Sequence, residues 1–131
     1  MFEYLVFSEE NAFQGQQEIR IEVDGARLRY RLLDETVSTI LPESGKEVEG
    51  IYSGDVEDYI SQLESFDVSR WKDKYYIPAC DGYSWDLRYK EVGKPCRKIT
   101  GSNDCPDCYE EFVDHLFSIS IDNGNEMGVL R

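Results

Sequence analysis

The stretch DGYSWDLRYKEVGKPCRKITGSNDCPDCYEEFVDHLF, residues 81 to 117, decides the fold of this chain. It opens with Asp81-Gly82, a pair typical of turns. Apolar and charged residues then alternate from Trp85 to Lys90, a period of two that predicts a strand with one buried face. Gly93 predicts a turn, and Pro95 suits the start of the returning strand because it has no backbone N–H to donate. The first half of the stretch therefore predicts a β-hairpin.

The second half of the stretch predicts a helix that packs on this hairpin. Asn103 or Asp104 is expected to cap the helix, because a side-chain oxygen can accept a hydrogen bond from a free helical N–H. Pro106 suits the first turn, where its missing N–H costs nothing. Apolar residues recur at three- and four-residue spacing, which predicts a stripe that lies on the sheet. This stripe contains Tyr109, Phe112, Val113, Leu116 and Phe117.

Part of the stretch resembles the motif of a small bacterial domain family of unknown function. Members of that family carry a DG-x-x-W-x-L strand, followed by a G-S-N-x-x-P corner that opens a helix. The resemblance runs roughly from residue 63 to residue 117 and implies no activity, cofactor or site. The matching residues are Trp71, Tyr75, Asp81, Gly82, Trp85, Leu87, Tyr89, Gly101, Ser102, Asn103, Pro106 and Phe112.

Upstream, the chain reads as strands followed by a helix. Phe2 to Phe7 is a short apolar run that predicts a strand, and the polar residues Ser8 to Gln16 predict a loop. Two alternating runs meet at Asp24-Gly25, which predicts a hairpin with a two-residue turn at that pair. This register places Glu22 opposite Arg27, Arg20 opposite Arg29 and Glu18 opposite Arg31, with Ile21 opposite Leu28 and Ile19 opposite Tyr30.

The middle of the chain is harder to interpret. Residues 34 to 52 have no clear period, although Val37, Ile40 and Leu41 favour burial. Ser53 or Gly54 is expected to open a helix that ends near Phe66. Its predicted apolar stripe contains Val56, Tyr59, Ile60 and Leu63.

Taken together, these elements predict an α+β fold. We expect an antiparallel sheet of about five strands, with two helices packed on one face. The 131 residues suit one globular domain, residues 1–131. A turn is expected at residues 122–125, and the last residues are expected to be frayed.

The net charge of −13 limits the classes of partner. It disfavours nucleic acid and anionic membranes, because like charges repel, and it favours a basic protein. The N-terminal residues contain no secretory signal and no transmembrane run, so a cytoplasmic location is expected. In a reducing compartment, the four cysteines are expected to be free thiols.

Cys105 and Cys108 form the sharpest chemical motif, a Cys-x-x-Cys at a helix start. Such a pair can be redox-active when the helix dipole lowers a thiol pKa. It can also bind zinc, here together with Cys80 and Cys96, although structural zinc usually takes two close pairs of ligands. The favoured interpretation is two small, partly buried residues without metal, and the resembling family often has an aromatic residue at the position of Cys105.

Two further sets of residues have competing interpretations. His115, the only histidine, lies beside the helix stripe and is predicted to be a surface or boundary residue rather than a general base. One face of the upstream hairpin can contact an anion or can pair with acidic neighbours, and pairing is favoured. The cations of that face are Arg20, Arg27, Arg29 and Arg31.

The sequence contains no recognisable catalytic constellation, so an enzyme is not predicted. We expect an acidic interaction module without a cofactor, and one concrete version is an immunity-type protein that neutralises a basic toxin. The alternative is a small metal-binding or thiol redox protein that uses Cys105 and Cys108. The expected contact carboxylates open the two helices: Asp55, Glu57, Asp58, Asp107, Glu110 and Glu111.

Overall fold

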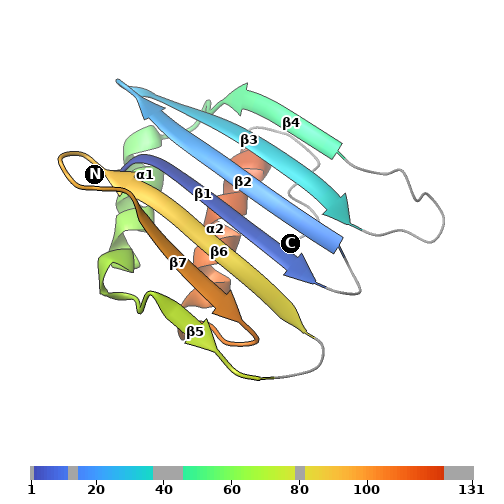
Figure 1. The fold of residues 1–131 in the computed structure, drawn as a ribbon. Coiled ribbons are helices and arrows are strands. Elements are labelled where there is room, and N and C mark those ends of the chain that lie inside the picture. Colours follow the sequence, from blue (N-terminus) through green and yellow to red (C-terminus); the bar gives the residue numbers. More distant parts are fainter. Residues whose placement is uncertain (1, 12–14, 37–45, 79–81, 123–131) are drawn as a thin grey trace.

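A computed structural model describes residues 2–11, 15–36, 46–78 and 82–122. Within these ranges, seven strands form one sheet, and two α-helices cover one of its faces (Figure 1). The elements are β1 Phe2–Asn11, β2 Gly15–Asp24, β3 Arg27–Thr36, β4 Lys46–Ile51, α1 Val56–Ser65, the short 3-10 helix Val68–Arg70, β5 Lys74–Tyr76, β6 Tyr83–Glu91, β7 Arg97–Ser102 and α2 Tyr109–Asp122.

The strand order is β4-β3-β2-β1-β6-β7-β5. All neighbours are antiparallel except β5 and β7, which are parallel. The α+β class and the two helices on one face agree with the sequence prediction. The prediction of about five antiparallel strands was wrong, because the sheet of the described residues is larger and mixed.

Both strands that the sequence did not indicate lie at the edges of the sheet. β4 falls in the region without a clear period, and β5 has only three residues. An edge strand pairs on one side only, and short or charged edges limit pairing with other chains. Short edge strands need no long alternation of apolar and polar residues. The alternation in the sequence therefore did not predict β4 and β5. The apolar residues Val37, Ile40 and Leu41 lie outside the described residues.

The loop predicted from Ser8 to Gln16 is largely strand. β1 continues to Asn11 and β2 begins at Gly15, so the two strands pair beyond the core. The added pairs are polar, and the Gln17 amide donates to the Glu9 carboxylate at 3.3 Å. Because polar residues occupy both faces there, the hydrophobic alternation ends before the strands do.

The β2–β3 hairpin turns one residue later than predicted. Its two turn residues are Gly25 and Ala26, and Gly25 has a φ of 63°. Glycine with positive φ at the first turn position is typical of a type II′ turn, which matches the twist of the strands. The later turn changes the cross-strand partner of each residue by two positions. Because side chains alternate between the two faces of a strand, every side chain stays on its predicted face. The observed pairs are Asp24–Arg27, Glu22–Arg29, Arg20–Arg31, Glu18–Leu33, Val23–Leu28, Ile21–Tyr30 and Ile19–Leu32.

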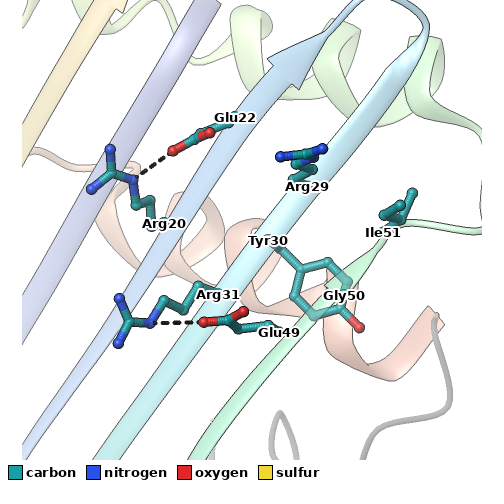
Figure 2. Close-up of a pocket in the computed structure, with 8 residues that line it drawn as sticks. All are labelled: Arg20, Glu22, Arg29, Tyr30, Arg31, Glu49, Gly50 and Ile51. Carbon is teal, nitrogen blue, oxygen red and sulfur yellow. Dashed lines mark hydrogen bonds and ion pairs between the residues drawn. The ribbon is translucent and has the colours of Figure 1, made fainter.

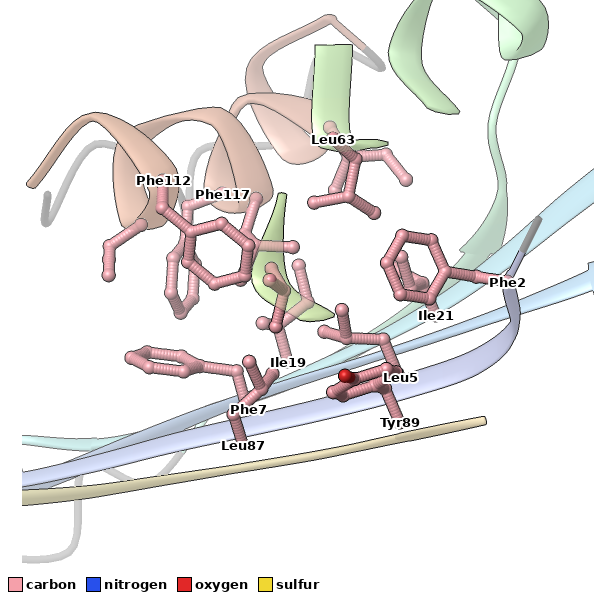
Figure 3. Close-up of a cluster of buried hydrophobic side chains, with 14 of the residues drawn as sticks. Phe2, Leu5, Phe7, Ile19, Ile21, Leu63, Leu87, Tyr89, Phe112 and Phe117 are labelled. Atoms are coloured by element: carbon pink, nitrogen blue, oxygen red, sulfur yellow. The ribbon is translucent and has the colours of Figure 1, made fainter. Parts of the chain in front are cut away.

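The core lies between the sheet and the helices (Figure 3). Phe112 of α2 is fully buried, and its ring lies 5.0 Å from Trp71 and 5.4 Å from Phe66. The predicted stripe of α2 is buried throughout. Trp71 is also buried in the core, with its ring edge-on to Trp85.

The two helices begin later than the sequence indicated. α1 is capped by Asp55, not by Ser53 or Gly54, and the Asp55 carboxylate accepts from the Asp58 backbone N–H at 3.0 Å. α2 begins at Tyr109, so Pro106 precedes the helix and its carbonyl accepts from the Tyr109 N–H. Of the turn predicted at residues 122–125, residues 123–125 lie outside the described residues, as do the last residues of the chain.

Three of the residues that carry the resemblance lie at the corner between β6, β7 and α2. The Trp85 indole lies directly over Gly101, and its N–H donates to the Asp104 carbonyl at 2.9 Å. Asn103 has a φ of 58°, and its side-chain oxygen accepts from the Tyr83 N–H. Trp85, Gly101 and Asn103 therefore fix the path of the chain at this corner.

Candidate functional site

The charge of the protein is concentrated in the layer that covers the sheet. Residues 55–67 and 104–122 contain α1 and α2 with their flanking turns, and we call them the helical layer. They hold eleven acidic residues and no lysine or arginine, so they account for eleven of the thirteen net negative charges. All fourteen lysines and arginines lie elsewhere in the chain, against the remaining sixteen acidic residues. The helical layer therefore carries most of the net charge of the chain.

The six carboxylates expected at a contact surface are all exposed, but they form two groups. The helices lie side by side and run antiparallel, since Tyr59 near the start of α1 stacks on His115 at 4.5 Å. Phe66 at the end of α1 packs on Phe112 near the start of α2. The first turns of the two helices therefore lie at opposite ends of the layer. The groups are Asp55, Glu57 and Asp58 at one end and Asp107, Glu110 and Glu111 at the other.

Glu64 and Asp114 add further exposed carboxylates to the helical layer. Both side chains are exposed, and they come from the second half of α1 and the middle of α2. The helical periodicity gives the signal for them, because both positions lie off the apolar stripes. The acidic surface thus runs along the layer instead of forming one compact patch.

The predicted arginine face lies on the side of the sheet opposite to α1 and α2 (Figure 1). There a depression of about 490 Å³ is lined by Arg20, Arg29 and Arg31 (Figure 2). The Arg20 and Glu22 side chains are 2.9 Å apart, and the Arg31 and Glu49 side chains are 3.5 Å apart. Arg27 is exposed and lies opposite Asp24 at the hairpin end.

Two cations that the sequence did not single out extend this face. The register places Arg31, Arg20, Val6, Arg88 and Lys98 in one row across five strands. Arg88 also has an acidic neighbour, Asp86, at 3.9 Å. The face is thus a mixture of both charges. Arg31–Glu49 and Arg29–Asp24 pair across strands, whereas Arg20–Glu22 and Arg88–Asp86 pair within a strand, so cross-strand pairing accounts for only part of it.

His115 is half-buried between the helices. Its Nε2 lies 2.8 Å from the Tyr59 carbonyl oxygen. A carbonyl only accepts hydrogen bonds, so Nε2 donates and the ring joins α2 to α1. This contact accounts for the histidine without a catalytic role and agrees with the predicted boundary position.

The Cys105 and Cys108 thiols are partly buried at the start of α2. Burial raises the pKa of Cys108, and the nearby Glu111 and Asp107 carboxylates raise this pKa further. Among the described residues, no group of three or more His, Cys, Asp or Glu side chains is arranged to hold a metal ion. Cys96 is exposed, and Cys80 lies outside the described residues.

The raised pKa gives a pH-dependent prediction for Cys108. At pH 7 its thiolate fraction is expected to be lower than that of an ordinary thiol, so iodoacetamide should alkylate it more slowly than free cysteine. The rate should rise as pH approaches the raised pKa. Peptide-resolved mass spectrometry over pH 7–10 measures this rate, and a denatured sample is the control. Alkylation in the folded protein as fast as in the denatured sample would contradict the assigned burial.

Comparisons with known proteins supply no assignment for these surfaces. No protein-family model matches the chain, and a comparison with curated proteins finds no match. In the part of the chain that the structure describes, no helix is long and apolar enough to cross a membrane. The function must therefore be inferred from charge and geometry.

Proposed function

We propose that this protein is a non-enzymatic interaction module that binds a basic protein through its helical layer. One observation carries the proposal: eleven of the thirteen net negative charges lie in the two segments of this layer, which contain no lysine or arginine. An immunity-type protein that neutralises a basic toxin is one concrete form of such a module, located in the bacterial cytoplasm.

Electrostatics explains why this arrangement favours binding. A net charge magnitude of about 2–8 suffices for the solubility of a small domain, and greater charge costs stability through self-repulsion. Complementary fields, however, accelerate association with a partner of opposite charge. Carboxylates gathered on one layer create such a field on one side of the molecule. The cation-rich side of the sheet carries roughly balanced charges and provides no comparable field.

The structure gives less support to the alternative that uses Cys105 and Cys108. A redox or metal-binding thiol must be readily deprotonated, because the thiolate is the nucleophile and the ligand. The environment of Cys108 has the opposite effect, since burial and two carboxylates raise its pKa. The interaction module is therefore the function that the geometry supports best.

Capture from a lysate of the native host tests the proposal. The immobilised protein should retain a protein with a pI above about 9. The variant Asp58→Lys/Glu110→Lys/Asp114→Lys should lose it, because it reverses charge on both helices. The control Glu10→Lys/Glu18→Lys/Glu49→Lys makes the same change in net charge on the sheet and should retain it. Equal retention by both variants, or capture of acidic proteins alone, would count against the proposal.

A further inference from the structure

A groove lies between α1 and the tip of the β2–β3 hairpin. Its volume is about 770 Å³, within the usual range of ligand sites. Val23 and Ala26 come from the hairpin, and Val56 and Ile60 from α1. Val23 and Val56 are only half-buried, so the groove presents an apolar surface to solvent.

The rim of this groove is acidic. Asp55, Glu57 and Glu64 line it, and no lysine or arginine belongs to its lining. The depression on the other face of the sheet differs, because three arginines line it. An acidic rim repels fatty acids, phosphates and nucleic acid, and it attracts cations. A ligand that fits both features therefore combines an apolar group with positive charge.

The positions on α1 define the spacing that such a ligand needs. Glu57, Ser61 and Glu64 lie at i, i+4 and i+7, on one face of the helix above the groove. With a rise of 1.5 Å per residue, Glu57 and Glu64 are about 10 Å apart along the axis. Residues four apart in an extended peptide lie on the same face and span about 13 Å. The long, flexible side chains of lysine and arginine can close the remaining difference. Two cations at that spacing can meet both carboxylates while an apolar side chain between them enters the groove.

We infer that this groove binds an extended basic segment of the protein partner and that its anchor is one leucine-sized side chain midway between two cations four residues apart. The inference rests on the proposed function and adds to it the docking position and the chemistry of the bound segment. The apolar anchor supplies affinity by burial, while the flanking cations supply orientation.

Synthetic peptides test the anchor directly. The probe is acetyl-GKRLSRKG-amide, and the control peptide replaces its leucine by serine without changing the charge. NMR titration at low salt should give about tenfold tighter binding for the leucine peptide, equivalent to about 1.4 kcal/mol. The shifted methyl signals should belong to Val23, Ala26 and Val56.

Variants of α1 separate the groove from general charge attraction. Ser61→Trp fills the groove from an exposed helix position and should abolish the tenfold preference for leucine. Ser65→Trp makes the same substitution at an exposed position outside the lining and should preserve it. Both proteins should retain the weaker, salt-sensitive binding of the serine peptide.

The outcomes distinguish this inference from the proposed function. If both peptides bind equally, and Ser61→Trp changes neither affinity, the groove is not the docking position. The acidic layer then still attracts basic segments. If neither peptide binds at low salt, the groove assignment fails, while partner capture from the host decides the proposed function independently.

Discussion

Phe112→Ala is expected to lower the free energy of unfolding by about 3–5 kcal/mol, the usual cost of removing a fully buried aromatic ring. Phe112 has no exposed surface, and it packs against residues from three separate elements. Its ring centroid lies 6.3 Å from Phe7 of β1, 5.4 Å from Phe66 and 5.0 Å from Trp71. These neighbours belong to the sheet, the end of α1 and the following turn. Because they lie on separate elements, we expect that they cannot move together to fill the cavity that Phe112→Ala leaves.

Urea denaturation followed by circular dichroism measures this loss. Glu111→Ala is the matched control, because its side chain is the exposed neighbour on the same helix. A surface substitution of this kind should change stability by less than about 0.5 kcal/mol. A loss below about 1.5 kcal/mol for Phe112→Ala would show that the ring is not the central contact between the layers.

Gly101→Ala is expected to cost about 3 kcal/mol, the upper end of the usual range for overpacking a core. A Cβ atom at this position would lie 2.0 Å from Nε1 of Trp85. The indole cannot move easily, because its ring contacts Trp71, Tyr75 and Tyr109. A displaced indole would also lose its hydrogen bond to the Asp104 carbonyl.

A double-mutant cycle tests this explanation. The variant Trp85→Phe removes the atom that the new methyl group meets, so Gly101→Ala should cost less in that background by at least about 1 kcal/mol. Gly93→Ala is a control for backbone strain alone, because Gly93 has a φ of 78° and open space around it. That substitution should cost about 1–2 kcal/mol. Strict additivity of Trp85→Phe and Gly101→Ala would contradict the proposed close contact.

The elements predicted correctly are those whose signals are local. The alternation from Trp85 to Lys90 gives β6, and the apolar spacing from Tyr109 gives the buried stripe of α2. The β2–β3 turn shows the limit of such signals. Both registers put the same side chains on the same face, so the hydrophobic pattern could not choose between a turn at Asp24-Gly25 and one at Gly25-Ala26.

The candidate site was predictable in composition but not in arrangement. The six exposed carboxylates follow from the helix-start pattern, yet their separation depends on the antiparallel packing of α1 on α2. The groove joins Val23 and Ala26 of the β2–β3 hairpin to Val56 and Ile60 of α1, which follows the next strand, β4. Tertiary structure alone creates that contact, and no spacing within the chain encodes it.

The most direct test of electrostatic capture is the association rate with the captured basic partner, measured by stopped-flow fluorescence. Between about 0.02 and 0.3 M salt, the rate constant should fall at least tenfold, because screening shortens the range of the acidic field. The variant Asp58→Lys/Glu110→Lys/Asp114→Lys should slow association more than it speeds dissociation. An association rate that is unchanged by both salt and charge reversal would contradict the function proposed for the helical layer.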